Sequence, residues 1–203
     1  MGKGRLEAFS DGVFAIIITI MVLELKTPEG ATLAALRPMC APFTAYAVSF
    51  AYVGIYWVNH HHLLNTAKSV SGLILWANLA LLFALSLVPL TTAWIGEHPD
   101  APVPTCAYGI VLTGAGVWWL ILQHAIIRQE GPDSALARAI GRDIKGRISF
   151  LAYIIAAVLA FVATWMADAI YVGIALMWIA PDPRIARVLA RERGGGGGPE
   201  LEG

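Results

Sequence analysis

Long stretches without charged residues place the strongest constraint on how this chain folds. Asp, Glu, Lys and Arg are all absent from residues 38–67, 69–96, 101–127, 148–167 and 169–181. About 20 consecutive apolar residues suffice for a helix to cross the hydrocarbon core of a bilayer. Helices are expected there because a backbone in lipid must satisfy its own hydrogen bonds. The sequence therefore predicts an all-α, polytopic membrane protein.

The composition excludes an ordinary soluble domain. Of the 203 residues, 58% are hydrophobic and 14% are charged, whereas about 25% are charged in a typical soluble domain. The mean hydropathy is +0.67. Because 14 Lys and Arg balance 14 Asp and Glu, neither a basic nucleic-acid-binding surface nor an acidic tail is predicted. The expected surroundings are a lipid bilayer, with no nucleic-acid partner.

The charge-free stretches and their flanks predict six transmembrane helices. The expected spans are approximately 5–26, 38–66, 69–95, 103–128, 147–167 and 169–190. The first is expected to remain in the protein, because charged residues precede it and no small-residue cleavage site follows it. Residues 1–193 should form one six-helix unit, and the glycine-rich residues 194–203 a flexible tail outside the fold.

Basic residues at the span ends predict which side faces the cytoplasm. Twelve of the 14 Lys and Arg fall on the side that holds both termini, and only Lys26 and Arg37 fall on the other. Since positive residues accumulate on the cytoplasmic side, both termini are expected in the cytoplasm and the cell membrane is the expected location. The basic connection between the fourth and fifth spans is predicted to be a short amphipathic cytoplasmic helix or a loop.

The first predicted helix carries the most specific pattern. Four large apolar side chains fall on one side of its helical wheel, three of them within about 40° of Ile16. They are Phe9, Ile16, Ile20 and Leu23. Thr19 lies about 60° to one side of Ile16, whereas Ser10 and Asp11 point the other way. A charge at the bilayer centre costs roughly 2.5 kcal/mol or more, so Asp11 requires a partner or an interfacial depth, and Arg5 is a candidate partner.

One interrupted motif connects this helix to a known family. Arg5, Phe9, Ser10 and Asp11 form an Arg-x-x-x-Phe-Ser-Asp string. This string resembles the motif that opens the first helix of a six-helix repeat in the TMEM175 family of potassium-permeable channels. The likeness continues through residues 12–16 and Thr19 to the positions Trp57, His60, His61, Asn78, Leu79 and Pro89. It is detailed over residues 5–90 and only hydropathic after that.

The resemblance implies a passive channel for potassium and other monovalent cations, without a cofactor. One repeat in the chain implies a homotetramer with the first helix of each subunit lining a central pore. Ile16 falls at the family's principal constriction position, Ile20 and Leu23 continue the same face, and Thr19 adds a hydroxyl ring. A ring of aliphatic side chains can gate by dewetting. The potassium-filter string Thr-Val-Gly-Tyr-Gly is absent from the sequence, so strong selectivity is not expected.

The aliphatic stripe and the Ser10–Asp11 pair also have plainer interpretations. An aliphatic stripe at this spacing is typical of any seam between buried helices, and without the motif we would favour that interpretation. For Ser10 and Asp11 we favour a structural hydrogen-bond network over direct ion contact, since they face away from the stripe. This structural motif network is expected to join Arg5, Phe9, Ser10 and Asp11 to Trp57, His60 and Asn78.

Other functions find weaker support in the sequence. A secondary or proton-coupled transporter could use Asp11 and the histidines, but transporters usually contain broken helices, and Pro38, Pro42 and Pro89 are expected near span ends. A haem or metal protein is disfavoured because the adjacent residues 60–62 fan over about 200° of a helix and cannot converge on one ion. No phosphate-binding loop, nucleophile elbow or paired carboxylate points to an enzyme.

Overall fold

The computed structural model describes residues 2–140 and 144–179, and every regular element in these ranges is helical. The elements are α1 (Lys3–Leu23), a 3₁₀ helix η1 (Leu33–Met39), α2 (Cys40–Thr66), α3 (Gly72–Ser86), α4 (Val88–Glu97), α5 (Pro102–Glu130), α6 (Ala135–Ile140), α7 (Ile144–Leu159) and α8 (Thr164–Ile179).

Four helical segments in the described ranges are long and apolar enough to cross a membrane. They are Lys3–Leu23, Leu33–Thr66, Gly72–Glu97 and Pro102–Glu130. The described parts of α7 and α8 have 16 residues each, about 24 Å at 1.5 Å per residue, which is shorter than a typical hydrocarbon core. The first four predicted spans therefore have spanning length, and the six-span count stays a prediction.

The third predicted span consists of two consecutive helices. Its α3 half ends at Ser86 and its α4 half begins at Val88, with Leu87 between them and Pro89 in the first turn of α4. Proline has no backbone N–H and disfavours helical geometry in the residue before it, which accounts for the interruption. The expectation that Pro89 lies near a span end was wrong. Because the third span is itself a broken helix, unbroken helices can no longer be used as an argument against a transporter.

The boundary between the last two predicted spans was also wrong. It was expected at Asp168, but α7 ends at Leu159 and Asp168 lies within α8. The turn at residues 160–163 lies inside a charge-free run and contains neither Gly nor Pro. We attribute it to packing instead: α7 and α8 lie against each other, and the small side chains of Ala160 and Ala167, almost fully buried, allow a close approach.

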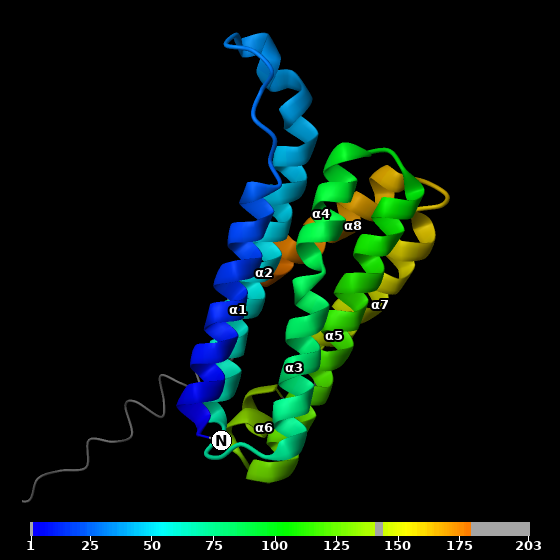
Figure 1. Ribbon diagram of the computed structural model, residues 1–203. Helices are drawn as coiled ribbons and strands as arrows, with labels where there is room; N and C mark the ends of the chain where they lie inside the picture. The colour runs from blue at the N-terminus through cyan, green and yellow to red at the C-terminus, as the bar shows by residue number, and fades with distance from the viewer. Residues whose placement is uncertain (1, 141–143, 180–203) are drawn as a thin grey trace, which may run out of the picture.

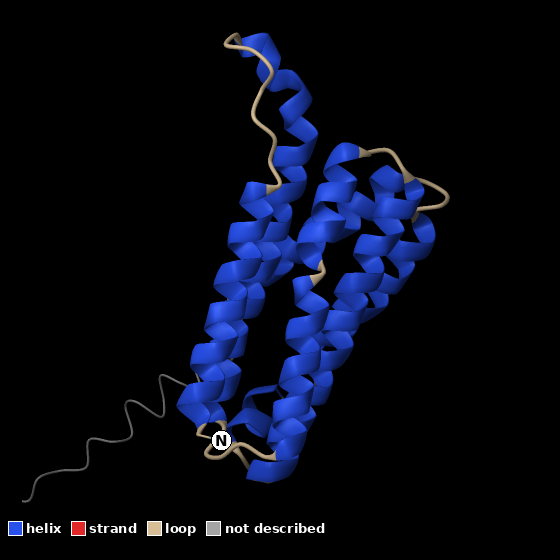
Figure 2. Ribbon diagram, in the orientation of Figure 1, coloured by secondary structure: helices blue, strands red, loops and turns tan. Residues whose placement is uncertain are grey.

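The helices form an elongated bundle with connections at its two ends (Figures 1 and 2). The start of α1, the connection 67–71 and α6 lie at one end, and the connections 24–32, 98–101 and 160–163 lie at the other. We call the first the basic end, because basic side chains gather there. In the described ranges they are Lys3, Arg5, Lys68, Arg128, Arg138, Lys145 and Arg147. The short helix α6 occupies the connection for which the sequence predicted a short helix or loop.

Candidate functional site

One face of α1 is packed against the rest of the subunit. The buried side chains recur every three or four residues, as expected for one side of a helix. They are Leu6, Ser10, Phe14, Ile17 and Met21. This face lies against α2, α3 and α4. The packing fixes the rotation of α1 about its own axis, and therefore decides which side chains point outward.

The opposite side of α1 leaves an apolar stripe uncovered within the subunit. We define the α1 stripe as Phe9, Ile16, Ile20 and Leu23. The exposed fraction is 60% for Ile16 and 76% for Leu23, whereas it is 2% for the adjacent Ile17. The four residues that share one side of the wheel are thus all on the subunit surface, and the seam between helices of one subunit lies on the other side.

Thr19 adds a polar atom beside the α1 stripe. Its hydroxyl is on the subunit surface and donates a 2.8 Å hydrogen bond to the carbonyl oxygen of Ala15. Because the hydroxyl proton is used within the helix, the oxygen presents only lone pairs outward. A hydroxyl in this state can accept from water or contact a cation.

A buried hydrogen-bond chain joins α1, α2 and α3. Asn78 Nδ2 donates to Ser10 Oγ at 3.0 Å, and Ser10 Oγ donates in turn to the carbonyl oxygen of Leu6 at 2.8 Å. His60 Nε2 lies 2.6 Å from Asn78 Oδ1. Since that oxygen can only accept, His60 carries a proton on Nε2. The rings of His60 and Phe14 are also in contact, with centroids 5.4 Å apart.

Asp11 lies outside this chain, on the surface of the subunit. Trp57 Nε1 of α2 donates a 2.9 Å hydrogen bond to Asp11 Oδ1, and both side chains are exposed. The side chain of the candidate partner Arg5 makes no hydrogen bond or ion pair with any described residue. The structure therefore brings Ser10, His60 and Asn78 together, pairs Asp11 with Trp57, and leaves Arg5 on the surface.

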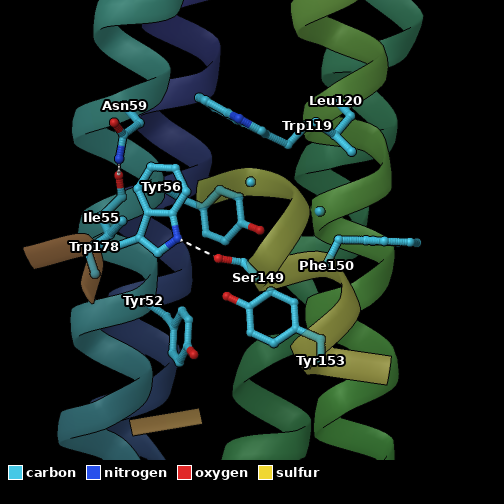
Figure 3. A pocket seen from close by; sticks show the side chains of 12 residues that line it. Tyr52, Ile55, Tyr56, Asn59, Trp119, Leu120, Ser149, Phe150, Tyr153 and Trp178 are labelled. Atoms are coloured by element: carbon cyan, nitrogen blue, oxygen red, sulfur yellow. Dashed lines mark hydrogen bonds between the residues drawn. The ribbon is translucent and has the colours of Figure 1, made fainter. Parts of the chain in front are cut away.

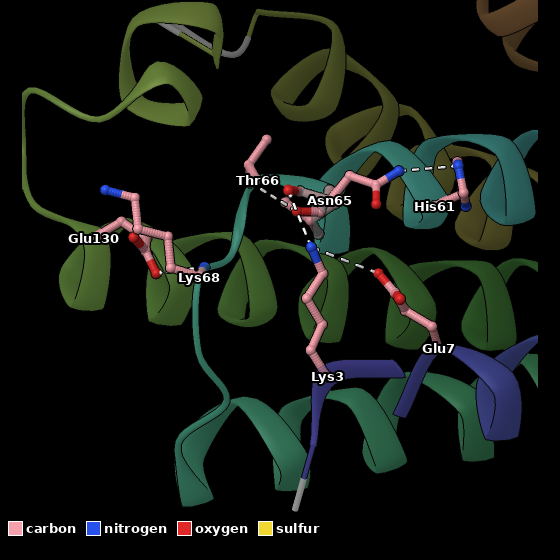
Figure 4. Close-up of polar contacts among 8 residues, drawn as sticks. Lys3, Glu7, His61, Asn65, Thr66, Lys68 and Glu130 are labelled. Atoms are coloured by element: carbon pink, nitrogen blue, oxygen red, sulfur yellow. Dashed lines mark hydrogen bonds and ion pairs between the residues drawn. The ribbon is translucent and has the colours of Figure 1, made fainter. Parts of the chain in front are cut away.

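The basic end is held together by contacts that use charged side chains (Figure 4). Lys3 Nζ donates to the carbonyl oxygen of Asn65 at 3.1 Å and lies 3.7 Å from Glu7 Oε1. Across the same end, the backbone N–H of Lys68 donates to Glu130 Oε1 at 2.8 Å. These contacts connect the start of α1 to the end of α2, and the connection 67–71 to the end of α5.

The opposite end contains a cavity of about 570 Å³ beneath the connection 24–32. Lys26 Nζ contacts Glu97 Oε1 of α4 at 2.5 Å, so an ion pair ties this connection to α4. Glu97 raises the pKa of Lys26, by its hydrogen bond and by its negative charge. Nearby, Gly96 permits a close approach of α4 to α2, because a Cβ there would lie only 2.9 Å from Pro42 Cα.

A second buried polar cluster was not anticipated from the sequence. Ser49 Oγ lies 2.9 Å from the Tyr108 hydroxyl and accepts a 2.7 Å hydrogen bond from Thr92 Oγ1. Nearby, the Tyr52 hydroxyl donates to the carbonyl oxygen of Tyr171 at 2.6 Å. These contacts join α2 to α4, α5 and α8. Hydroxyl groups within charge-free spans are the sequence signal that could have pointed to it, because buried polar groups need partners.

The histidines and cysteines do not form a recognisable centre. In the described ranges no group of three or more His, Cys, Asp or Glu side chains is arranged to hold a metal ion. His61 pairs with Asn65 and His124 with its own helix. Cys40 and Cys106 are both free thiols.

Sequence comparisons connect this chain to ion channels. A family model described as endosomal/lysosomal potassium channel TMEM175 matches residues 5–89. A potassium channel of Chryseobacterium sp. (strain P1-3) is 52% identical over 93% of this chain and 98% of its own length. A potassium channel of Streptomyces collinus is 33% identical over 79% of this chain and 84% of its own length.

A solved structure and an animal protein extend the comparison. The crystal structure of a lysosomal potassium-selective channel TMEM175 homolog from Chamaesiphon minutus matches with a TM-score of 0.74 and 29% identity, covering 87% of this chain and 96% of that one. An endosomal/lysosomal proton channel TMEM175 of Bos taurus is 31% identical over 81% of this chain, which spans only 38% of that protein.

Proposed function

The chain belongs to the TMEM175 family, and from that premise we propose that it is a potassium-permeable cation channel that conducts passively through a membrane. The observation that carries the proposal is the 52% identity, over nearly the full length of both chains, to a bacterial potassium channel. Members of this family are ion channels and not enzymes. Residues 1–193 would act as one channel unit.

The proposed assembly is a homotetramer in which the α1 stripes of four subunits face a common axis. The exposure of the α1 stripe supports this assembly, because no other part of the subunit covers it. Exposed apolar side chains in a membrane protein need either lipid or another subunit as a neighbour. In this arrangement Phe9 would pack at the end of the stripe nearest the basic end, and Ile16, Ile20 and Leu23 would line the axis.

The proposed constriction is formed by Ile16, with Ile20 and Leu23 continuing it toward the end opposite the basic end. Aliphatic rings of this kind block ions by excluding water until the ring widens. The outward lone pairs of Thr19 would offer hydrated cations an oxygen ring between these apolar levels. The Ser10–Asn78–His60 chain and the Asp11–Trp57 bond would fix the position and rotation of α1 without contacting ions.

The proposed orientation places the basic end, with the start of α1, in the cytoplasm. The described residues at that end include seven Lys or Arg, against Lys26 and Arg37 elsewhere, and positive residues favour the cytoplasmic side. The cell membrane is the proposed location.

The proposal is tested by cation flux into liposomes that contain the purified full-length chain. We expect potassium flux that exceeds sodium flux and that persists without a proton gradient. Strict dependence on a proton gradient would identify a coupled transporter, and a large chloride flux would exclude a cation channel. A Soret band in the purified protein would point to a haem protein. Because the cattle relative is named a proton channel, proton flux is measured in the same liposomes.

A further inference from the structure

The α1 stripe has a charged residue at each of its two ends, and the two charges have opposite signs. Arg5 is in the first turn of α1 and lies about 20° from Ile16 on the helical wheel. Glu24 directly follows Leu23, and its backbone still has helical geometry. Both charged side chains are exposed. They lie about 28 Å apart along the helix axis, close to the thickness of a hydrocarbon core, so each falls near one membrane surface.

The positive charge of Arg5 is not compensated within the described part of the subunit. Its side chain makes no hydrogen bond or ion pair with any residue there. The charges of Lys3 and Glu7, which flank it in the same turns of α1, offset each other at 3.7 Å. Asp11 is about 120° away on the wheel and accepts a hydrogen bond from α2. The guanidinium of Arg5 therefore remains as a net charge at this end of the stripe.

A net negative charge remains at the opposite end. The cavity beneath the connection 24–32 has four charged residues in its wall, which are Glu24, Lys26, Glu29 and Glu97. Lys26 forms an ion pair with Glu97 of α4, so its charge is offset there. The side chain of Glu24 makes no hydrogen bond or ion pair within residues 2–140 and 144–179. Three carboxylates against one ammonium group leave this end of each subunit acidic.

The cavity drawn in Figure 3 does not provide an alternative path for ions. It lies inside the subunit, between α2 on one side and α5 and α7 on the other, and has a volume of about 50 Å³. Six aromatic side chains, three of them tyrosines, contribute to its wall, and none of the residues that line it is charged. A cation that entered it would lose its hydration without a carboxylate in compensation, which is costly. The charges that act on permeating ions are therefore those beside the α1 stripe.

We propose that Arg5 and Glu24 make conduction directional, so that cations enter more readily from the Glu24 end than from the Arg5 end. The inference rests on the proposed function, in which four stripes face one axis and the basic end is cytoplasmic. Four copies then place like charges around each mouth of the pore. A mouth lined by charges of one sign changes the local concentration of permeant ions. Potassium is concentrated at the outer mouth and depleted at the inner one, so inward current exceeds outward current.

Currents through excised patches from cells that express the full-length chain test this inference. The solution is the same KCl on both sides, and equal and opposite voltages are compared. At about 0.1 M KCl we expect the inward current to be about threefold larger, a small part of the effect that strongly charged clefts have on ion concentration. At about 1 M KCl the Debye length falls from about 10 Å to about 3 Å, so the ratio should approach one. This salt dependence is measured on the wild type and requires no variant.

Substitutions then assign the effect to the two residues. Arg5→Gln and Glu24→Gln should each bring the current ratio closer to one, whereas Arg5→Lys keeps the charge and should preserve the ratio. The matched controls are Arg128→Gln at the basic end of α5 and Asp100→Asn in the connection 98–101. Both remove exposed charges of the same signs outside α1, and they should leave the ratio unchanged.

The possible failures of the inference and of the channel assignment differ. Wild-type potassium currents that are equal in both directions, or larger outward, would overturn the inference and leave the channel standing. So would a ratio that neither Arg5→Gln nor Glu24→Gln changes, which is the result expected if both side chains faced lipid headgroups. A wild-type chain that carries no potassium current in either direction would contradict the proposed function itself, and this inference with it.

Discussion

Asn78 of α3 donates a 3.0 Å hydrogen bond to Ser10 of α1, and both side chains are completely buried. Ser10 belongs to the Phe-Ser-Asp motif, and Asn78 lies 68 residues later in the chain. The pair therefore joins the helix that carries the candidate pore surface to the interior of the subunit, and it does so on the side of α1 opposite the exposed stripe.

Replacing Asn78 by Leu should destabilise the protein without altering ion preference. The change removes the amide that bonds both Ser10 and His60, and leaves the buried Nε2–H of His60 without an acceptor, at a cost of about 1–3 kcal/mol. The measurement is the melting temperature in detergent. Ser86→Ala is the control, because the exposed Ser86 hydroxyl only donates to its own helix. Equal melting temperatures for wild type, the variant and the control would contradict a structural role for Asn78.

Replacing Asp11 by Ala should weaken assembly and leave the conduction path itself intact. The variant removes the acceptor of Trp57 Nε1, which ties the exposed surface of α1 to α2. Size-exclusion chromatography should show smaller or aggregated species, and Trp57→Phe should have a similar effect. Trp118→Phe, at an exposed position of α5, is the control. A fully assembled Asp11→Ala protein of normal stability without cation flux would show that the carboxylate faces the ions.

Replacing Lys26 by Gln should loosen the connection 24–32 while the bundle stays folded. The ion pair with Glu97 is the contact that ties this connection to α4, and both groups are solvent-exposed. Because Glu97 raises the pKa of Lys26, the pair is complete at neutral pH and is lost as the pH rises through that raised value, or when acid protonates the Glu97 carboxylate. Hydrogen exchange of residues 24–32 should accelerate in the variant. Unchanged exchange would show that the ion pair does not restrain the connection.

Replacing Gly109 by Ala should destabilise the contact of α5 with α7 and α8. An added methyl group would overlap the hydroxyl of Tyr171 and lie 3.0 Å from Cβ of Ala157. Overpacking of this kind costs typically about 1–3 kcal/mol. Gly114→Ala in the same helix meets nothing within 4 Å and should be neutral. The comparison of their melting temperatures checks this close approach, and equal values would contradict it.

Hydropathy was sufficient to predict an all-helical membrane protein, because charge-free runs are properties of a single segment. The predicted pairing of Arg5 with Asp11 was wrong, because contacts between helices cannot be predicted from one segment. The reach of Arg5 along the helix made it a reasonable partner for Asp11, but the carboxylate is bound by Trp57, 46 residues away.

The same limit explains the boundaries that were wrong. The turn after α7 contains no residue that breaks a helix, and Asp168 continues α8, because close packing at Ala160 and Ala167 sets the boundary. The Ser49–Tyr108 contact was missed for the same reason. It requires knowing which helices are neighbours, which no single segment reveals.

The most direct test of the account is the potassium and sodium flux of Ile16→Asn in liposomes. Ile16 is 60% exposed on the α1 stripe, and Val22, at 45% exposed and about 120° away on the helix, is the matched control position. A polar ring removes the dewetting barrier, so Ile16→Asn should raise total flux and weaken the preference for potassium, whereas Val22→Asn should change neither. If Ile16→Asn forms an intact assembly and leaves both flux and preference unchanged, the α1 stripe does not line the pore.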